Sequence, residues 1–142
     1  MSASTLASAF IAASAAIIFL LGAVHLIYTV HGTRLHPRDA ELRIKLEQAP
    51  LVLTRQTTMW KAWIGFNLSH SCGALLFGAV YGYLALLQST FLFQSWFLLA
   101  LGLVLLGGYA FLGKRYWFKS PLRGIALATV FYVVALAIVV IR

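Results

Sequence analysis

Acidic residues are scarce in this sequence, which has three Asp and Glu residues against eleven Lys and Arg, and all three acids fall in one short segment, at Asp39, Glu41 and Glu47. The long apolar stretches therefore contain no carboxylate. This absence disfavours a proton-coupled transporter driven by a carboxylate inside the membrane, although His25 or His70 could titrate in its place. It also leaves a Ser-His-acid hydrolase without an orienting acid at the required depth.

Cysteine is almost absent, because Cys72 is the single one in the chain. One cysteine excludes an intrachain disulfide and a CxxC redox pair, so a thiol redox enzyme is not expected. We interpret Cys72 as a small packing residue. A zinc or copper site would need a third or fourth ligand beyond the available histidines, so no metal site is predicted. Nothing resembles a Walker loop or a dinucleotide fingerprint.

Hydrophobic residues are what the chain has in excess: they make up 62% of its 142 residues, charged residues make up 10%, and the mean hydropathy is +0.92. Soluble domains contain about 45–50% apolar residues, so this composition predicts a protein embedded in lipid. The net charge of +8 could suggest nucleic acid. The basic residues lie beside membrane segments, however, without a stacking platform or a groove-reading helix, so membrane lipids are the expected partners.

Four apolar runs are separated by charged or turn-forming residues. A membrane-spanning helix needs about 20 apolar residues, so the sequence predicts an all-α membrane four-helix bundle that forms a single domain over residues 1–142. Small residues near the N-terminus are reminiscent of a signal peptide, but without a basic region before them, so we expect an uncleaved first span. The predicted spans cover about residues 6–30, 60–87, 96–113 and 121–141.

Basic residues gather in two of the three connections, which sets the expected orientation. By the positive-inside rule, both connections should be cytoplasmic and both termini should lie on the non-cytoplasmic side. The connection at residues 88–95 carries no charge at all. The basic residues expected at the membrane surface include Arg34, Arg38, Arg55 and Lys61 in the first connection, and Lys114, Arg115, Lys119 and Arg123 in the last.

The first connection also has helix signals. Asp39 can begin a short helix through Gln48 that lies on the membrane surface, with Glu41 and Lys45 spaced i,i+4. Pro50 suits the first turn of another helix, which we expect to run unbroken into the second span.

Two smaller expectations concern the connections. Ser120 and Pro121 predict an N-cap and first residue for the last span. His31 and His36 are expected to be solvated loop residues.

Polar residues interrupt the second span, and one lies at a similar depth in the first. His70 is roughly 13 Å and His25 about 10 Å inside the cytoplasmic boundary, if each residue rises 1.5 Å. Because the first two spans are antiparallel neighbours, the two histidines can meet if their polar faces turn toward each other. The candidate polar core is His25, Asn67, Ser69, His70 and Ser71.

Three interpretations of this polar core remain open. The side chains can hydrogen-bond across helices and fix the bundle, a role that the Gly65-x3-Ser69-x3-Gly73 spacing supports as a close-packing motif. They can instead orient the polar head of a lipid, quinone or other apolar ligand. The third interpretation is haem b held between His25 and His70, since paired imidazoles on facing helices are a common haem scaffold.

The segment WKAWIGFNLSHSCGALLFGAVYGYLAL, together with the later RYWF-x2-P-x-RGIALAT, resembles a family of small bacterial four-span integral membrane proteins with no assigned activity. The resemblance covers nearly the whole chain. It implies a compact helical bundle in the bacterial inner membrane, and it supplies no catalytic residue or substrate.

The sequence therefore favours a non-enzymatic function. We expect a small membrane protein that binds an apolar ligand, or an accessory subunit of a larger membrane complex or homo-oligomer. No cofactor is predicted. The alternative is a redox protein that uses haem b or a quinone at His25 and His70.

Overall fold

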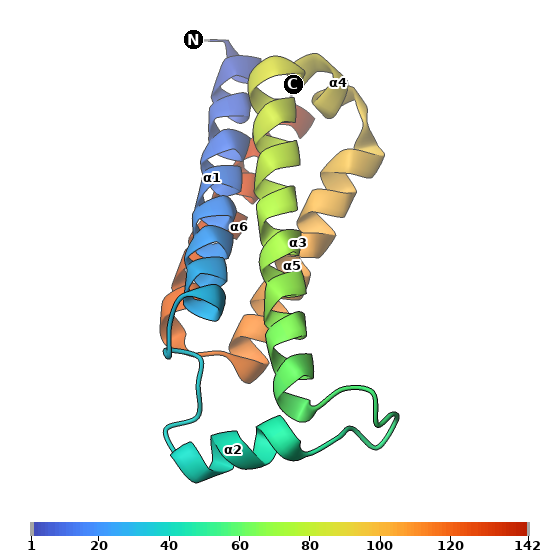
Figure 1. Ribbon diagram of the computed structural model, residues 1–142. Helices are drawn as coiled ribbons and strands as arrows, with labels where there is room; N and C mark the ends of the chain where they lie inside the picture. The colour runs from blue at the N-terminus through green and yellow to red at the C-terminus, as the bar shows by residue number, and fades with distance from the viewer. Residues whose placement is uncertain (1, 142) are drawn as a thin grey trace. The chain divides into compact units, whose positions relative to one another are not determined.

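Four of the helices in this protein are long and apolar enough to cross a membrane. The computed structural model describes residues 2–141, and this part of the chain is helical except for its connections and one isolated β-bridge (Figure 1). The predicted all-α fold is confirmed. The membrane-length helices are α1 (Ala3–Val30), α3 (Met59–Leu87), α5 (Trp96–Tyr116) and α6 (Lys119–Val140); α2 (Ala40–Gln48) and α4 (Ser89–Gln94) are short.

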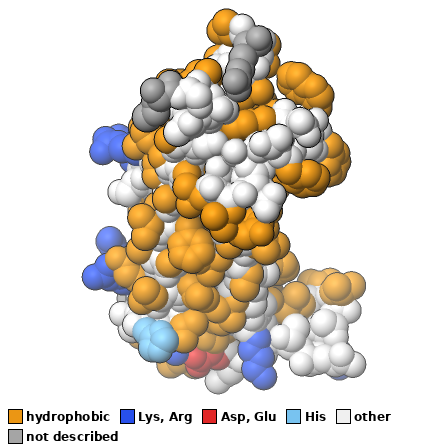
Figure 2. Space-filling model, turned by 90° about the horizontal axis from the view of Figure 1, so that it is seen from above, with side chains coloured by type: hydrophobic (Ala, Val, Ile, Leu, Met, Phe, Trp, Pro, Cys, Tyr) orange, Lys and Arg blue, Asp and Glu red, His pale blue; other side chains and the backbone are white. Residues whose placement is uncertain are grey.

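The four long helices match the predicted spans closely, and hydrophobic side chains are spread over much of the face drawn in Figure 2. Large apolar side chains such as Leu20, Phe66, Val104 and Phe111 are exposed on the long helices. In water such exposure would be costly, whereas in lipid these side chains are solvated by acyl chains. The chain is an integral membrane protein.

By its internal packing, the chain divides into two compact units. Unit 1 comprises the described residues up to Leu21 and those from Ala74 onward, whereas unit 2 is Gly22–Gly73. Helices α1 and α3 contribute residues to both units. Helix α1 begins in unit 1 and ends in unit 2, whereas α3 begins in unit 2 and ends in unit 1.

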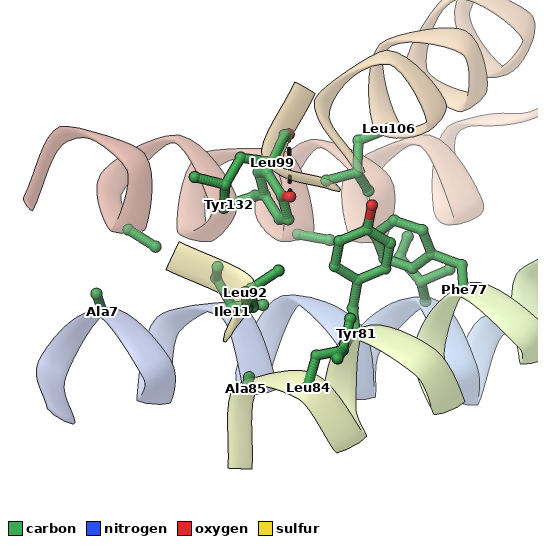
Figure 3. Packing of buried hydrophobic residues seen from close by; sticks show 14 of the residues in the cluster. Ala7, Ile11, Phe77, Tyr81, Leu84, Ala85, Leu92, Leu99, Leu106 and Tyr132 are labelled. Carbon is green, nitrogen blue, oxygen red and sulfur yellow. Dashed lines mark hydrogen bonds between the residues drawn. The ribbon is translucent and has the colours of Figure 1, made fainter. Parts of the chain in front are cut away.

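Unit 1 is built from segments of all four long helices around a buried apolar cluster (Figure 3). Helices α1 and α3 approach closely at Gly78, where a Cβ atom would lie 2.8 Å from the carbonyl oxygen of Ala15. Such close approach of backbones is the usual role of glycine between membrane helices. The labelled cluster members are Ala7, Ile11, Phe77, Tyr81, Leu84, Ala85, Leu92, Leu99, Leu106 and Tyr132.

Two tyrosines of unit 1 bond to the first turns of α5. The hydroxyl of Tyr81 donates to the carbonyl oxygen of Leu98 at 2.6 Å, and that of Tyr132 donates to Leu99 at 3.1 Å. Ser95 caps α5 by accepting a hydrogen bond from the backbone N–H of Leu98 at 3.3 Å. The beginning of α1 and the end of α6 lie at the same end of unit 1 as α4 (Figure 1).

In unit 2 the predicted short helix of the first connection is confirmed as α2. Asp39 is its N-cap, and the carboxylate accepts hydrogen bonds from the backbone N–H groups of Glu41 at 2.9 Å and Leu42 at 3.3 Å. Lys45 pairs with Glu41 at 2.7 Å, as the i,i+4 spacing indicates. The pair is exposed to solvent, so it adds little stability, and the cap is the stronger reason for the helix to begin at Ala40.

The predicted helix from Pro50 into the second span is wrong, because α3 begins only at Met59. Residues 50–58 form a loop that is closed by a bridge between Pro50 and Thr58. The backbone N–H of Met59 also donates to the carbonyl oxygen of Ala49 at 2.9 Å. β-branched residues are frequent in this segment, which lowers its helix propensity.

The predicted cap of the last span is also wrong by two residues. Helix α6 begins at Lys119 with Phe118 at the N-cap, and no side chain caps it. Pro121 is therefore the third helical residue. It is tolerated there because the first four N–H groups of a helix have no partner within the helix.

Candidate functional site

The candidate site in unit 2 is a polar cluster formed by His25 of α1 and Asn67 and His70 of α3. The Nε2 atom of His25 lies 2.9 Å from the Oδ1 atom of Asn67. The amide of Asn67 also donates from Nδ2 to the carbonyl oxygen of Trp63 at 2.8 Å. That second bond fixes the amide orientation, and since Oδ1 can only accept, the proton of this bond is carried by His25 Nε2.

The second histidine completes the cluster through its ring. The imidazoles of His25 and His70 meet edge to face, with centroids 5.2 Å apart and planes at 87°. His70 follows Asn67 by three residues, so both side chains project from the same face of α3. We call His25, Asn67 and His70 the polar triad.

Two buried hydroxyl groups next to the triad form hydrogen bonds with the backbone carbonyl groups of triad residues. Thr29 donates to the carbonyl oxygen of His25 at 2.8 Å, and Ser71 donates to that of Asn67 at 3.0 Å. Both are bonds to the carbonyl four residues earlier in the same helix, a local pattern that satisfies a buried hydroxyl without a partner helix. Ser71, predicted as a core residue, therefore lies next to the triad but has its hydroxyl directed at its own helix.

Ser69, the fifth predicted residue, is not brought to the triad. It is exposed, and its hydroxyl donates to the carbonyl oxygen of Phe66 at 2.9 Å. Helical geometry explains the difference, because a residue two positions after Asn67 lies on the opposite side of α3, whereas those three and four positions later lie on the same side.

All three triad side chains are only half-buried, although they belong to helices that are apolar enough to span a membrane. Polar groups at that depth are costly unless their hydrogen-bonding groups have partners. The triad meets this requirement in part through the contact between His25 and Asn67, and all three side chains remain partly exposed.

The arrangement of the two imidazoles bears on the haem interpretation. Histidines that ligate one haem iron lie on opposite faces of the macrocycle, which needs space between the rings. Here the rings contact each other directly, and His25 Nε2 bonds to Asn67. The described arrangement does not accommodate a haem between them. Within residues 2–141, no three His, Cys, Asp or Glu side chains are grouped so that they could hold a metal ion.

A second cluster in unit 2 was not predicted. The expectation that His36 is solvated is wrong, because its ring packs edge to face on Trp60 with centroids 4.9 Å apart, and Arg43 donates to its Nδ1 at 2.9 Å. The Arg43 guanidinium also lies over the Trp60 ring, 5.1 Å from its centroid. We call these three residues the α2 clamp. No spacing in the sequence could reveal it, because its members come from three separate segments.

The basic residues predicted at the membrane surface are all exposed. In unit 2, Arg34 lies over the ring of Tyr28 at 4.4 Å from its centroid and donates to the Tyr28 hydroxyl. In unit 1, Arg115 lies 5.9 Å from the centroid of the adjacent Tyr116 ring. The other members are Arg38, Arg55 and Lys61 in unit 2, and Lys114, Lys119 and Arg123 in unit 1.

Comparison with protein-family models, with curated proteins and with solved structures finds no match. The site is therefore interpreted from its own chemistry. The similarity to small bacterial four-span proteins stays a prediction.

Proposed function

We propose that this protein is a non-enzymatic membrane protein that binds an amphiphile of the lipid or quinone class through the polar triad. The observation that carries the proposal is the half-buried contact of His25 with Asn67 and His70 in helices of membrane-spanning length. An intramembrane cluster of ionisable and amide groups is by default a candidate binding site. A polar head placed against it would replace contacts with acyl chains by hydrogen bonds.

The triad has the chemistry to orient such a head. An imidazole can offer both a donor and an acceptor nitrogen, so it suits the carbonyl or hydroxyl group of a quinone or lipid head. Trp63 and Phe66 lie one helical turn before Asn67 and His70 on α3, and both are exposed. Their rings would line the path of the apolar tail. Since the three acids lie at Asp39, Glu41 and Glu47, no carboxylate activates either histidine for catalysis.

Mass spectrometry of lipids and quinones that co-purify with the protein tests this proposal. The wild type is compared with an Asn67→Leu, His70→Leu double variant, and Ser69→Ala serves as the control because Ser69 lies on the opposite side of α3. We expect one amphiphile to be enriched in the wild type and control and lost from the double variant. Equal content in all three proteins would leave the triad with a packing role.

Two further measurements test whether misfolding or a bound haem accounts for the result. The thermal stability of each variant shows whether a lost amphiphile only reflects a misfolded protein. A visible absorption spectrum of the purified wild type tests for haem. A Soret band together with bound iron would show that the site holds a redox cofactor and would contradict the proposed amphiphile.

A second candidate function is that of an accessory subunit, and it rests on small residues left open on two helices. Apart from the adjacent residues and the backbone of the same helix, no atom lies within 4 Å of the position that a Cβ would take at Gly65, Gly107 or Gly108. Gly65 begins a Gly-x3-Ser-x3-Gly motif that suits close contact with another membrane helix. Gentle extraction and native sizing should reveal a larger assembly that Gly65→Leu disrupts. A monodisperse monomer from native membranes would contradict this function.

We further propose that the membrane is the bacterial inner membrane, with both basic connections in the cytoplasm and both termini outside. The distribution of Lys and Arg supports this orientation. Alkaline phosphatase should be active when it is fused after the C-terminus or within residues 88–95. A fusion within residues 50–58 should be inactive. The opposite pattern of activity would show that the protein has the inverted orientation in the membrane.

A further inference from the structure

Residues 50–58, here called the apolar loop, connect α2 to α3 and are held in a defined shape at their base. The Pro50–Thr58 bridge and the hydrogen bond from Met59 N–H to Ala49 close the loop. Inside it, the backbone N–H of Thr54 donates to the carbonyl oxygen of Leu51 at 3.3 Å. The backbone N–H of Gln56 donates to the hydroxyl of Thr54 at 3.2 Å.

The tip of the apolar loop presents two hydrophobic side chains that contact almost nothing in the protein. Val52 is 110% exposed and Leu53 is 90% exposed, the highest values among the large hydrophobic residues of the described chain. Unlike the exposed residues of α1, α3, α5 and α6, these two lie outside every helix, so membrane-spanning segments do not explain them. Connections between helices usually carry polar residues at such positions.

We infer that Val52 and Leu53 insert into the headgroup layer and upper acyl region of the bilayer that carries the protein. The loop joins directly to the first turn of α3, where Trp60 and Lys61 are residue types typical of the membrane–water interface. Val52 is two residues from Pro50 and an extended chain advances about 3.3 Å per residue, so the backbone of the tip lies up to about 7 Å from the base of the loop and its side chains extend farther. Interfacial segments bury their apolar side chains to about 5–10 Å, which is within this reach.

The charge of the apolar loop indicates anionic lipid as its partner. No acidic residue occurs from Gln48 onward, and Arg55 is exposed within the loop. Anionic headgroups attract basic side chains near the surface, so Arg55 would hold the loop down while the adjacent apolar tip enters the bilayer. The tip has only two large side chains, too few for the hydrophobic core of a stable protein–protein interface.

Site-directed fluorescence in proteoliposomes tests this inference with the full chain. In a Cys72→Ser background, an environment-sensitive dye is attached at Val52→Cys, and at Glu41→Cys as the control on the acidic start of α2. Vesicles contain phosphatidylethanolamine with phosphatidylglycerol, with or without nitroxide-labelled lipid. We expect quenching by the nitroxide lipid to be at least about two-fold stronger for the dye at position 52 than for the dye at position 41.

A charge variant distinguishes lipid attraction from simple proximity. Arg55→Glu should reduce quenching at position 52 in vesicles with phosphatidylglycerol and change it little in vesicles of phosphatidylcholine. A dye at position 52 that is unquenched by nitroxide lipid and is quenched freely by aqueous iodide would overturn the inference. Position 52 is exposed, so labelling it does not disturb the packing of unit 2.

Discussion

The imidazole of His25 packs edge to face against that of His70, with the ring centroids 5.2 Å apart, and His25 also forms a hydrogen bond with Asn67. Helices α1 and α3 thus share a polar contact in unit 2. An interhelical hydrogen bond in a membrane contributes about 0.6 kcal/mol on average and at most about 1.7. The contact therefore has a measurable but modest effect on stability. The half-buried rings also suit the proposed binding of an amphiphile.

Removing the amide tests the structural part of this contact. We expect Asn67→Leu to lower the free energy of unfolding by about 0.6–1.7 kcal/mol, because His25 Nε2 loses its partner. Denaturation in mixed micelles measures the change. Ser69→Ala should have almost no effect, since its hydroxyl bonds only to its own helix. Equal stability of Asn67→Leu and the wild type would show that the bond is not formed.

Gly102 of unit 1 should tolerate an added methyl group poorly, because it faces the rings of two buried tyrosines. A Cβ there would lie 2.6 Å from Tyr132 Cζ and 2.9 Å from Tyr81 Cε1, with the Tyr132 hydroxyl closer still. We expect Gly102→Ala to destabilise the protein by about 1–3 kcal/mol through overpacking. The control is Gly107→Ala on the same helix, where nothing lies within 4 Å. Similar stabilities of the two variants would contradict the described packing of α5.

Loss of the α2 clamp should loosen the first connection without unfolding the spans. Arg43→Ala removes the hydrogen bond to His36 and the contact with the Trp60 ring, and an exposed cation–π contact is worth about 0.5–1 kcal/mol. Hydrogen exchange of the α2 amides should become faster in this variant. Lys45→Ala is the matched control, because the Lys45–Glu41 pair is exposed to solvent. If both variants exchange equally, the clamp does not hold α2.

Hydropathy predicts the spans well here, because each long helix is apolar along most of its length and the charged residues lie in the connections or near the ends of the long helices. The start of α2 is equally readable, since Asp39 is a strong N-cap residue followed by an i,i+4 pair. That His25 and His70 lie at a similar level along α1 and α3 also follows from helix rise. Their actual contact depends on the rotation of α1 and α3 about their axes, which depth alone does not determine.

The connections are less predictable because several weak preferences compete there. Pro50 suits a helix start, yet the same residue bridges Thr58, and the loop between them has an exposed apolar tip. Helix α6 begins at Lys119, two residues before Pro121, since a proline is tolerated anywhere in the first turn. His36 joins a ring contact whose members lie far apart in sequence, and no local pattern encodes such a meeting.

The most direct test of the proposed amphiphile site is the nuclear magnetic resonance of ring nitrogens in ¹⁵N-histidine-labelled protein. The chain has four histidines, and His31 is exposed in the first connection, so it serves as an internal control. The spectrum in synthetic phosphatidylcholine nanodiscs is compared with that after addition of a total bacterial lipid and quinone extract. We predict that the His25 and His70 signals shift while the His31 signal does not. Unchanged His25 and His70 signals at saturating extract would contradict the account.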